Sequence, residues 1–183
     1  MKKIVLVALA LVVALSAGAQ DKRWFVNGSA DFGWYKVKEV QGSYTAFELT
    51  PSINYKLSNN WAIGLGVKYG YERVSDANYI VEDSWVGVAP RVTYIAKIAP
   101  NFYYVPNAQL SWDYGFESKD MVFGIAVAPL SFEYRVSKCL GLVFKAGSLG
   151  FDYYMPDAEG ASDSYGAYIH LNKDLGFGFN FYF

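Results

Sequence analysis

Hydrophobic and polar positions alternate with a period of two along most of the chain. In residues 46–57 the odd positions are apolar or proline, and the even positions are small, polar or charged. Residues 61–72 alternate in the same way, and the polar sequence Ser58-Asn59-Asn60 separates the two segments. Because successive side chains of a β-strand point to opposite faces, each segment is predicted to be a strand with one apolar face. Together the two segments form a predicted hairpin with a tight turn.

Eight segments in total alternate in this way and are predicted to be strands. They span residues 24–36, 46–57, 61–72, 85–97, 102–116, 121–135, 140–154 and 165–183. The sixth and seventh segments each change parity once, which indicates a β-bulge in each. The bulge of the sixth is expected near Leu130 and Ser131, because the repeat of Leu49–Tyr55 returns there with its tyrosine one residue late.

The connections between these strands favour an up-and-down arrangement. Short turns at 58–60, 97–100 and 136–139 alternate with longer polar loops at 36–43, 74–83 and 155–163, and only the connection at 117–120 departs from this by being short as well. Short turns at one end and long loops at the other are typical of outer-membrane barrels. The prolines at 51, 90, 106 and 129 oppose a strand assignment, because proline cannot donate a ladder hydrogen bond, and bulges are expected to accommodate them.

Which face of the sheet points inward decides between a membrane barrel and a soluble one. A soluble calycin-type barrel would hold the apolar face inside. The polar face is rich in glycine, alanine and serine, which suits a narrow eight-stranded interior. Aromatic residues gather at both ends of the strands, as in the two aromatic girdles of membrane barrels. The sequence therefore predicts an all-β, eight-stranded, antiparallel, up-and-down transmembrane β-barrel.

Composition and the first residues refine this prediction. Hydrophobic residues make up 53% and aromatic residues 19% of the chain, yet no segment after the first twenty residues is long and apolar enough for a membrane helix. Lys2 and Lys3, the apolar stretch 4–15 and the small residues 17–19 have the order of a cleaved signal peptide. We expect residues 1–19 to be this signal and 20–183 to be one barrel domain, with a retained N-terminal anchor as the alternative.

Several function classes are disfavoured by charge and by the rare residues. The formal net charge is −1, so no basic excess indicates a nucleic-acid partner. The only cysteine, Cys139, cannot form an internal disulfide, and a single histidine leaves no Cys/His spacing of the metal-binding kind. We therefore expect neither a metal site nor a cofactor.

The chain resembles a known family at several points. These are the signal-like start, the Pro-x-[Ile/Val]-x-Tyr sequences, turns such as Tyr55–Trp61 and Tyr134–Leu140, and the ending Leu175–Phe183. These features resemble the small outer-membrane β-barrel proteins common in Bacteroidetes, which are similar in plan to the eight-stranded X-type and A-type barrels. The resemblance implies location in the cell outer membrane, contact with its lipid and lipopolysaccharide, and a terminal Phe183 that the barrel assembly machinery reads. It implies hardly anything about activity.

Five charged residues on the polar face form the first candidate site. Asp31, Glu48, Lys68, Arg91 and Lys145 lie at comparable distances from the short turns. Isolated charges in a narrow interior would be very unfavourable, so we expect these side chains to pair and to fill the interior. The alternative is a narrow, gated channel for small solutes.

The last predicted strand holds a candidate surface site. If Phe183 marks the inner edge of the membrane, a strand of about ten residues places Lys173 at the outer boundary, where it can contact lipopolysaccharide phosphates. Residues 165–171 would then protrude and could bind an extended segment of an extracellular protein by strand addition. In the competing interpretation residues 172–174 form a turn and the barrel has nine strands.

Catalysis and cation binding are the remaining alternatives. Some outer-membrane barrels modify lipids with an activated histidine, and His170 lies on the polar face of the last strand. No Ser-His-acid spacing accompanies it, so we expect a non-enzymatic, monomeric protein with a structural or surface-interaction role. Two loops are acidic and are candidates for a cation or a cationic partner; they contain Asp76, Glu82, Asp83, Asp157, Glu159 and Asp163.

Overall fold

The structure is a computed structural model that describes residues 23–37, 42–75, 79–157 and 161–183, with only the backbone course for residues 31–37 and 170–175. The predicted signal peptide at 1–19 lies outside the described residues. All regular structure in the described ranges is β-strand, and none of their residues form a helix long and apolar enough to cross a membrane.

Eleven strand segments make up the described fold. They are β1 (Trp24–Val37), β2 (Gly42–Lys56), β3 (Trp61–Ser75), β4 (Ile80–Tyr94), β5 (Ala96–Ala99), β6 (Phe102–Tyr104), β7 (Asn107–Gly115), β8 (Met121–Ala128), β9 (Ser131–Arg135), β10 (Leu140–Met155) and β11 (Ser164–Tyr182). Each predicted strand range corresponds to one segment or to two successive segments, but β2 and β4 begin four and five residues before the predicted starts at 46 and 85, so the loops predicted at 36–43 and 74–83 are shorter than expected.

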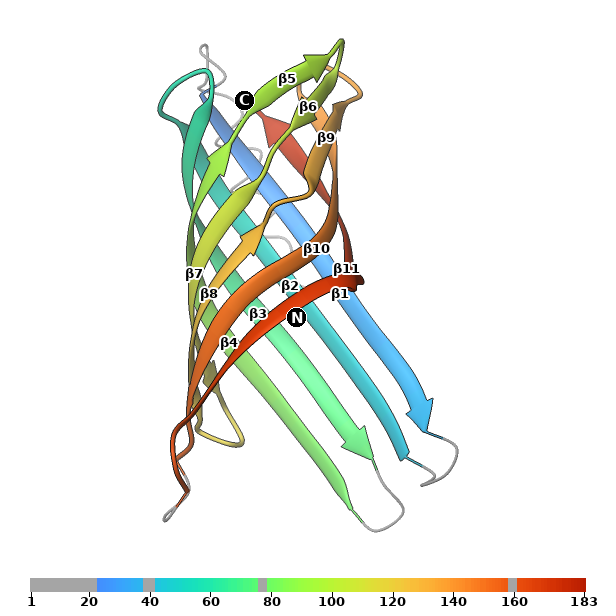
Figure 1. Ribbon diagram of the computed structural model, residues 1–183, viewed down its shortest axis with the longest axis vertical. Coiled ribbons are helices and arrows are strands. Elements are labelled where there is room, and N and C mark those ends of the chain that lie inside the picture. The colour runs from blue at the N-terminus through green and yellow to red at the C-terminus, as the bar shows by residue number, and fades with distance from the viewer. Residues whose placement is uncertain (1–22, 38–41, 76–78, 158–160) are drawn as a thin grey trace.

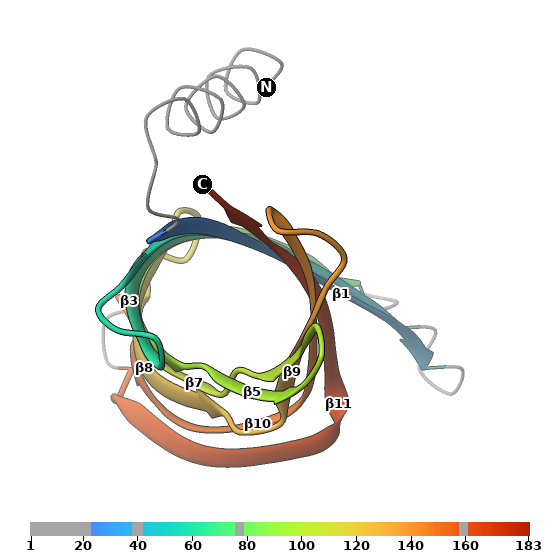
Figure 2. The same cartoon turned by 90° about the horizontal axis from the view of Figure 1, so that it is seen from above.

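The strands close into a barrel. Antiparallel pairing runs in the order β11-β1-β2-β3-β4-β7-β8-β10, and β10 pairs with β11 to complete the ring. Figure 1 shows the tilted strands of this wall, and Figure 2 looks along the barrel. The short segments β5, β6 and β9 extend the wall beyond β4, β7 and β8 at the end of the short turns. The predicted all-β, antiparallel, up-and-down fold is confirmed.

The predicted irregularities are present. The sixth predicted strand breaks between β8 and β9, at Pro129 and Leu130. In β10 the register shifts between Ala146 and Ser148, and Gly147 between them adopts a φ of 78°, a left-handed conformation that favours glycine. Both irregularities agree with the changes of parity in the sequence.

The prolines sit where a ladder on one side is interrupted. Pro51 keeps its place opposite Gly28 in β1, but the ladder from β2 to β3 skips the positions between Leu49 and Ser52. The ladder from β4 to β7 skips Pro90 in the same way, and Pro106 and Pro129 lie between strand segments. Since a residue in an antiparallel strand donates to one neighbour only, each proline costs a single local gap in the wall.

The apolar face lies outside and the polar face inside. Leu65, Ile125 and Phe177 on the outer face are 52%, 53% and 67% exposed, whereas Asn54 on the inner face is 1% exposed. The buried polar and charged residues are Asn27, Ser29, Thr50, Ser52, Asn54, Arg91, Asp113, Ser131, Glu133 and Asn180. The inverted arrangement expected of a membrane barrel is confirmed, and the soluble alternative with an apolar interior is wrong.

Aromatic side chains pair across strands near the short turns. The rings of Trp24 and Tyr55 lie 4.8 Å apart, and those of Trp61 and Tyr94 lie 5.0 Å apart. Toward the opposite end, the rings of Trp112 and Phe123 stack at 5.7 Å. These pairs form two levels of aromatic side chains on the outer wall, as the girdle interpretation expects.

The last strand differs from both interpretations of its sequence. β11 is continuous through residues 172–174, so the turn of the nine-strand alternative is absent from the described backbone. However, Ala146 of β10 pairs with Leu175 and Ser148 pairs with His170, so that only Gly147 stands opposite residues 171–174. The strand therefore contains a large register shift where the sequence indicated regular alternation.

Candidate functional site: the polar interior of the barrel

Two of the five predicted charges meet inside the barrel. Lys68 of β3 lies 3.6 Å from Glu48 of β2, and its Nζ donates a 2.8 Å hydrogen bond to Asp113 of β7. Thr50 donates a 3.1 Å hydrogen bond to Glu48 as well. We call Glu48, Lys68 and Asp113 the lysine cluster. Asp113 lies on the predicted polar face but is not among the five predicted charges.

Glycines in neighbouring strands make room for this cluster. A Cβ atom at Gly87, which faces Lys68 across the ladder, would lie 1.9 Å from Asp113 Oδ1. A Cβ at Gly70 would lie 2.0 Å from the indole of Trp85. Large inward side chains therefore lie across glycines of the adjacent strand, which explains why the polar face is so rich in small residues.

Arg91 belongs to a different level of the interior. Gly64 faces Arg91 across the β3–β4 ladder, whereas Gly87 faces Lys68, so Arg91 lies nearer to the short turns. Its Nη1 donates a 3.0 Å hydrogen bond to Asn27 Oδ1, and Asn27 Nδ2 donates a 2.9 Å bond to Asn180 Oδ1. We call Arg91 and these two asparagines the amide cluster.

The remaining two predicted charges are Lys145, which lies apart from the lysine cluster, and Asp31, of which only the backbone is described. Lys145 of β10 lines a cavity together with Arg91. Asp31 faces Glu48 across the β1–β2 ladder, but its side chain lies outside the described residues. The structure thus brings Glu48 and Lys68 together, and holds Arg91 with amides.

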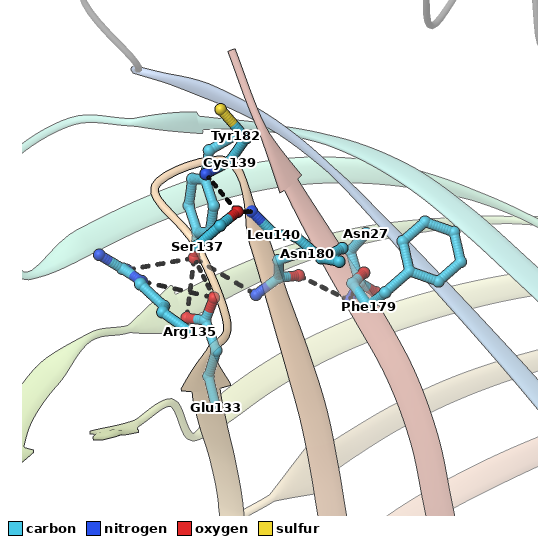
Figure 3. A network of polar contacts seen from close by, with 9 residues as sticks. All are labelled: Asn27, Glu133, Arg135, Ser137, Cys139, Leu140, Phe179, Asn180 and Tyr182. Atoms are coloured by element: carbon cyan, nitrogen blue, oxygen red, sulfur yellow. Dashed lines mark hydrogen bonds and ion pairs between the residues drawn. The ribbon is translucent and has the colours of Figure 1, made fainter. Parts of the chain in front are cut away.

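A third polar group, which sequence reasoning missed, lies near the short turns (Figure 3). Glu133 of β9 is 0% exposed, and the hydroxyl of Tyr182 donates to its two carboxylate oxygens at 2.7 and 2.8 Å. Arg135 lies 3.5 Å from Glu133 and donates a 3.2 Å hydrogen bond to the Tyr182 hydroxyl. A Cβ atom at Gly141 would lie 1.9 Å from the Glu133 carboxylate, so this glycine makes the space for it. We call Glu133, Arg135 and Tyr182 the tyrosine cluster.

Aromatic rings complete the tyrosine cluster. The Arg135 guanidinium lies 3.8 Å from the ring centre of Tyr103 and 4.6 Å from that of Tyr182, and the ammonium of Lys56 lies 4.4 Å from the latter. Cations over aromatic faces gain electrostatic stabilisation, more so away from water. Glu133 becomes inward-facing after the break at Pro129, and the parity change indicated near Leu130 and Ser131 was the signal that could have found it.

Apolar residues fill the interior at the same end. Phe25, Ile95, Val105, Val143 and Tyr182 are each at most 5% exposed and pack together with Ala62. Ile95 and Val105 lie at breaks between strand segments, where the backbone still bonds across the gap, from Ile95 N to Asn60 O at 2.7 Å and from Val105 N to Ser131 O at 2.8 Å. These breaks turn apolar side chains inward. We call this group the apolar plug.

Carboxylates at the loop end bind neighbouring turns and tyrosines. Asp83 accepts hydrogen bonds from the backbone of Ser84 at 2.8 Å and of Glu117 at 3.2 Å. Burial raises the pKa of Asp83, but hydrogen bonds from Ser118, Glu117 and Ser84 outweigh it, so its pKa lies below the usual value. Through these bonds Asp83 connects β4 to the turn that contains Glu117, at the loop end of the barrel.

Two tyrosines at the same end donate to loop acids. The Tyr154 hydroxyl donates to Asp120, which also accepts a 2.9 Å bond from the backbone of Asp157. This hydrogen bond, with burial and the Asp120 charge, raises the pKa of Tyr154 to about 12. Tyr153 donates to Asp163 at 2.5 Å, and this bond, followed by burial and the Asp163 charge, raises its pKa. Among the described residues, no three His, Cys, Asp or Glu side chains are arranged to hold a metal ion.

The other acidic loop residues add little. Glu82 forms an exposed ion pair with Arg73 at 3.4 Å. Asp76 and Glu159 lie outside the described residues. The acidic loops are thus partly accounted for by contacts within the chain.

The candidate residues of the last strand and turns are less informative. His170 and Lys173 belong to β11, and their side chains lie outside the described residues. Phe183 is buried, and its backbone N–H donates a 3.1 Å hydrogen bond to Trp24 O, which joins the end of the chain to the first strand. Cys139 is exposed, in the turn before β10.

Comparison with known proteins supports the fold. No family model matches the chain, and no curated protein matches it. Among solved structures, Neisserial surface protein A matches with a TM-score of 0.50 at 13% identity, covering 87% of this chain and 97% of that chain. A major outer membrane protein from Thermus thermophilus matches with a TM-score of 0.45 at 12% identity, over 87% of this chain and 99% of that one. OmpT, an outer membrane protein of Vibrio cholerae, matches with a TM-score of 0.30 at 13% identity, over 90% of this chain and 53% of that one. The similarity to the neisserial structure shows that the chain has the fold of a small antiparallel β-barrel.

Proposed function

We propose that the protein is an integral, eight-stranded outer-membrane β-barrel with a structural or surface-interaction role and no enzymatic activity. The observation that carries this proposal is the inverted barrel, with an apolar outer wall around a polar, filled interior. On this proposal residues 1–19 direct export, and the mature chain belongs to the small barrels common in Bacteroidetes that its sequence resembles.

The outer wall supports insertion in lipid. Large apolar side chains are exposed around it, among them Leu65 on β3, Leu110 on β7, Ile125 on β8 and Leu142 on β10, each about half exposed. A soluble monomer rarely exposes apolar patches of more than a few hundred Å². In a bilayer the same wall contacts hydrocarbon, and ring closure satisfies the backbone groups that lipid cannot.

Localisation can be tested by fractionation. Mature protein is expected with the outer membrane, and its gel mobility is expected to change on boiling, because closed barrels resist detergent until heated. Recovery of the protein as a soluble periplasmic monomer would contradict the proposal.

The contents of the interior favour a barrel filled by side chains rather than an open channel. The lysine cluster, the amide cluster and the apolar plug occupy successive parts of the described interior. An eight-stranded barrel is only just wide enough for its own side chains. Purified protein in planar bilayers is therefore expected to give no steady conductance, and reproducible ohmic steps with ion selectivity would favour the channel alternative.

A lipid-modifying enzyme is the second alternative and rests on His170 alone. Expression in a host of defined lipid composition is expected to leave lipid A and phospholipid acyl chains unchanged. A mass shift in either lipid that disappears in His170→Ala would overturn the non-enzymatic assignment.

The proposed surface role involves the loop end. Lys173 is proposed to contact lipopolysaccharide phosphates, and the outer part of β11 to bind an extracellular protein by strand addition. Tyr165 and Ile169 on this part are 77% and 73% exposed. The barrel itself is proposed to be a monomer whose assembly depends on Phe183.

A further inference from the structure

A small cavity lies inside the barrel beside the apolar plug. Its volume is about 20 Å³, and its wall includes Phe25, Val105 and Val143 of the plug. The rest of its wall is polar and consists of Asn27, Asn54, Arg91, Thr93, Asn107, Lys145 and Asn180. One occupant the size of a water molecule needs about 10–15 Å³ on this measure, so the cavity accepts a single small particle.

The charge of the cavity wall has one sign. Arg91 and Lys145 are cationic, and none of the described residues that line the cavity is a carboxylate. Three described acids of the interior lie with other cations: Glu48 and Asp113 lie with Lys68, and Glu133 lies with Arg135. None of these ion pairs includes Arg91, and no carboxylate is among the described residues that line the cavity beside it.

The guanidinium of Arg91 does not have a hydrogen-bond acceptor for each of its donors in this cavity. The residue is 8% exposed, and its Nη1 donates to Asn27, a neutral amide. Its Nε is buried without a hydrogen-bond partner in the described structure. A buried guanidinium without a counter-charge is very unfavourable in a barrel surrounded by hydrocarbon.

We propose that this cavity binds a small monovalent anion of the size of chloride, held by Arg91. The anion accepts the hydrogen bond that Nε does not make within the chain, and it neutralises the guanidinium. A water molecule would satisfy the bond but leave the charge. The inference goes beyond the structural role, since it holds for a conducting barrel as well as for a closed one.

Bromide, which replaces chloride and scatters anomalously, provides a direct test. Crystals of the mature wild-type protein grown in sodium bromide are expected to show an anomalous peak within hydrogen-bond distance of Arg91 Nε. Density for water alone, or an empty cavity, would overturn the proposal. This measurement needs no variant and does not depend on whether the barrel conducts.

Solution stability gives a second test with a matched control. At equal ionic strength, replacing sodium gluconate with sodium chloride is expected to raise the Tm of the wild-type protein by about 3 °C, as for any ligand that binds only the folded state. Arg73→Gln removes the same charge from an exposed ion pair with Glu82 and is expected to keep this rise, whereas Arg91→Gln should lose it. An equal rise in all three proteins contradicts a site at Arg91. If Arg91→Gln does not fold, the bromide crystals decide alone.

Discussion

The Nζ atom of Lys68 lies 2.8 Å from Oδ2 of Asp113, although 45 residues separate them in sequence. Their strands, β3 and β7, are not adjacent in the barrel, because β4 lies between them. Gly87 on β4 leaves the space through which the two side chains meet. The contact therefore spans β4 on the inner face and links two strands that share no ladder.

Removal of Lys68 should destabilise the barrel strongly. The side chains of Lys68 and Asp113 are only 12% and 11% exposed, so Lys68→Met leaves a buried carboxylate without its cation. Breaking a buried pair in this way costs about 3–5 kcal/mol. Urea unfolding of the refolded protein in lipid vesicles, followed by tryptophan fluorescence, measures the change in the free energy of unfolding.

Two further variants separate the loss of the pair from the loss of a lysine. Lys97→Met changes an exposed lysine on β5 and is expected to alter the free energy of unfolding by about 0.5 kcal/mol or less. The double variant Lys68→Met/Asp113→Asn should regain part of the lost stability, because the unpaired charge is gone. A double variant that is less stable than Lys68→Met would contradict a direct pairing.

The hydroxyl of Tyr182 should matter more than that of a tyrosine on the outer face. It donates to both oxygens of the fully buried Glu133, so Tyr182→Phe leaves that carboxylate short of a donor. A cost of about 1–3 kcal/mol in the free energy of unfolding is expected. Tyr134→Phe makes the same chemical change at a 51% exposed position of the same strand as Glu133 and is expected to be near neutral. Equal effects in the same urea assay would remove the special role of Tyr182.

The strands and their faces could be predicted because alternation is a local property of the sequence. The outward position of Leu65 and the inward position of Lys68 both follow from the period of two and from the decision that the barrel is inverted. The presence of a bulge in the strand that contains Gly147 could be predicted, since the parity changes once within it, but its position was not predicted.

Partners across the barrel could not be predicted, because they depend on register and on strand breaks. Asp113 meets Lys68 rather than Arg91 only because of the level at which β7 pairs with β4. Glu133 turns inward after the break at Pro129, as the change of parity indicates, but its contact with Tyr182 depends on the register of β9, β10 and β11. The apolar plug has the same origin at Ile95 and Val105, and its residues have the composition of the outer wall.

Tyr154 should titrate at unusually high pH. Its pKa is raised to about 12 by the hydrogen bond to Asp120, with burial and the Asp120 charge adding to it, above the value of about 10 expected for an unfolded chain. The contribution to stability is therefore fully present below about pH 10 and is lost as the pH rises to about 12. Ultraviolet difference absorbance during alkaline titration reports the tyrosinates, and Tyr154→Phe identifies the transition.

Asp120→Asn is the matched variant for this titration. It keeps the size of the side chain at 120 but removes the charge, so the pKa of Tyr154 is expected to move back toward its ordinary value. If Tyr154→Phe still shows the high-pH transition of the wild-type protein, that transition does not belong to Tyr154 and its contact with Asp120 does not control the titration.

Accessibility of β11 tests whether its outer part rises above the membrane. Ile169 and Phe179 lie on the same strand and are 73% and 47% exposed, so both side chains face outward. The ladder between β1 and β11 covers Phe25–Ala30 and Phe177–Tyr182, and beyond it β11 continues along β10 to Ser164. Phe179 thus lies within the closed part of the wall, and Ile169 lies in the part proposed to protrude.

Single cysteines at these two positions, in a Cys139→Ser background, can be labelled in intact cells with a membrane-impermeant maleimide. Cysteine at 169 is expected to react, because it faces water outside the cell, and cysteine at 179 is expected to stay unlabelled until the membrane is dissolved, because it faces hydrocarbon. The two sites differ in level but not in strand or face, so each is the control for the other. Protection of position 169 would place it in lipid, and strand addition at the outer part of β11 would then have no exposed edge on which to occur.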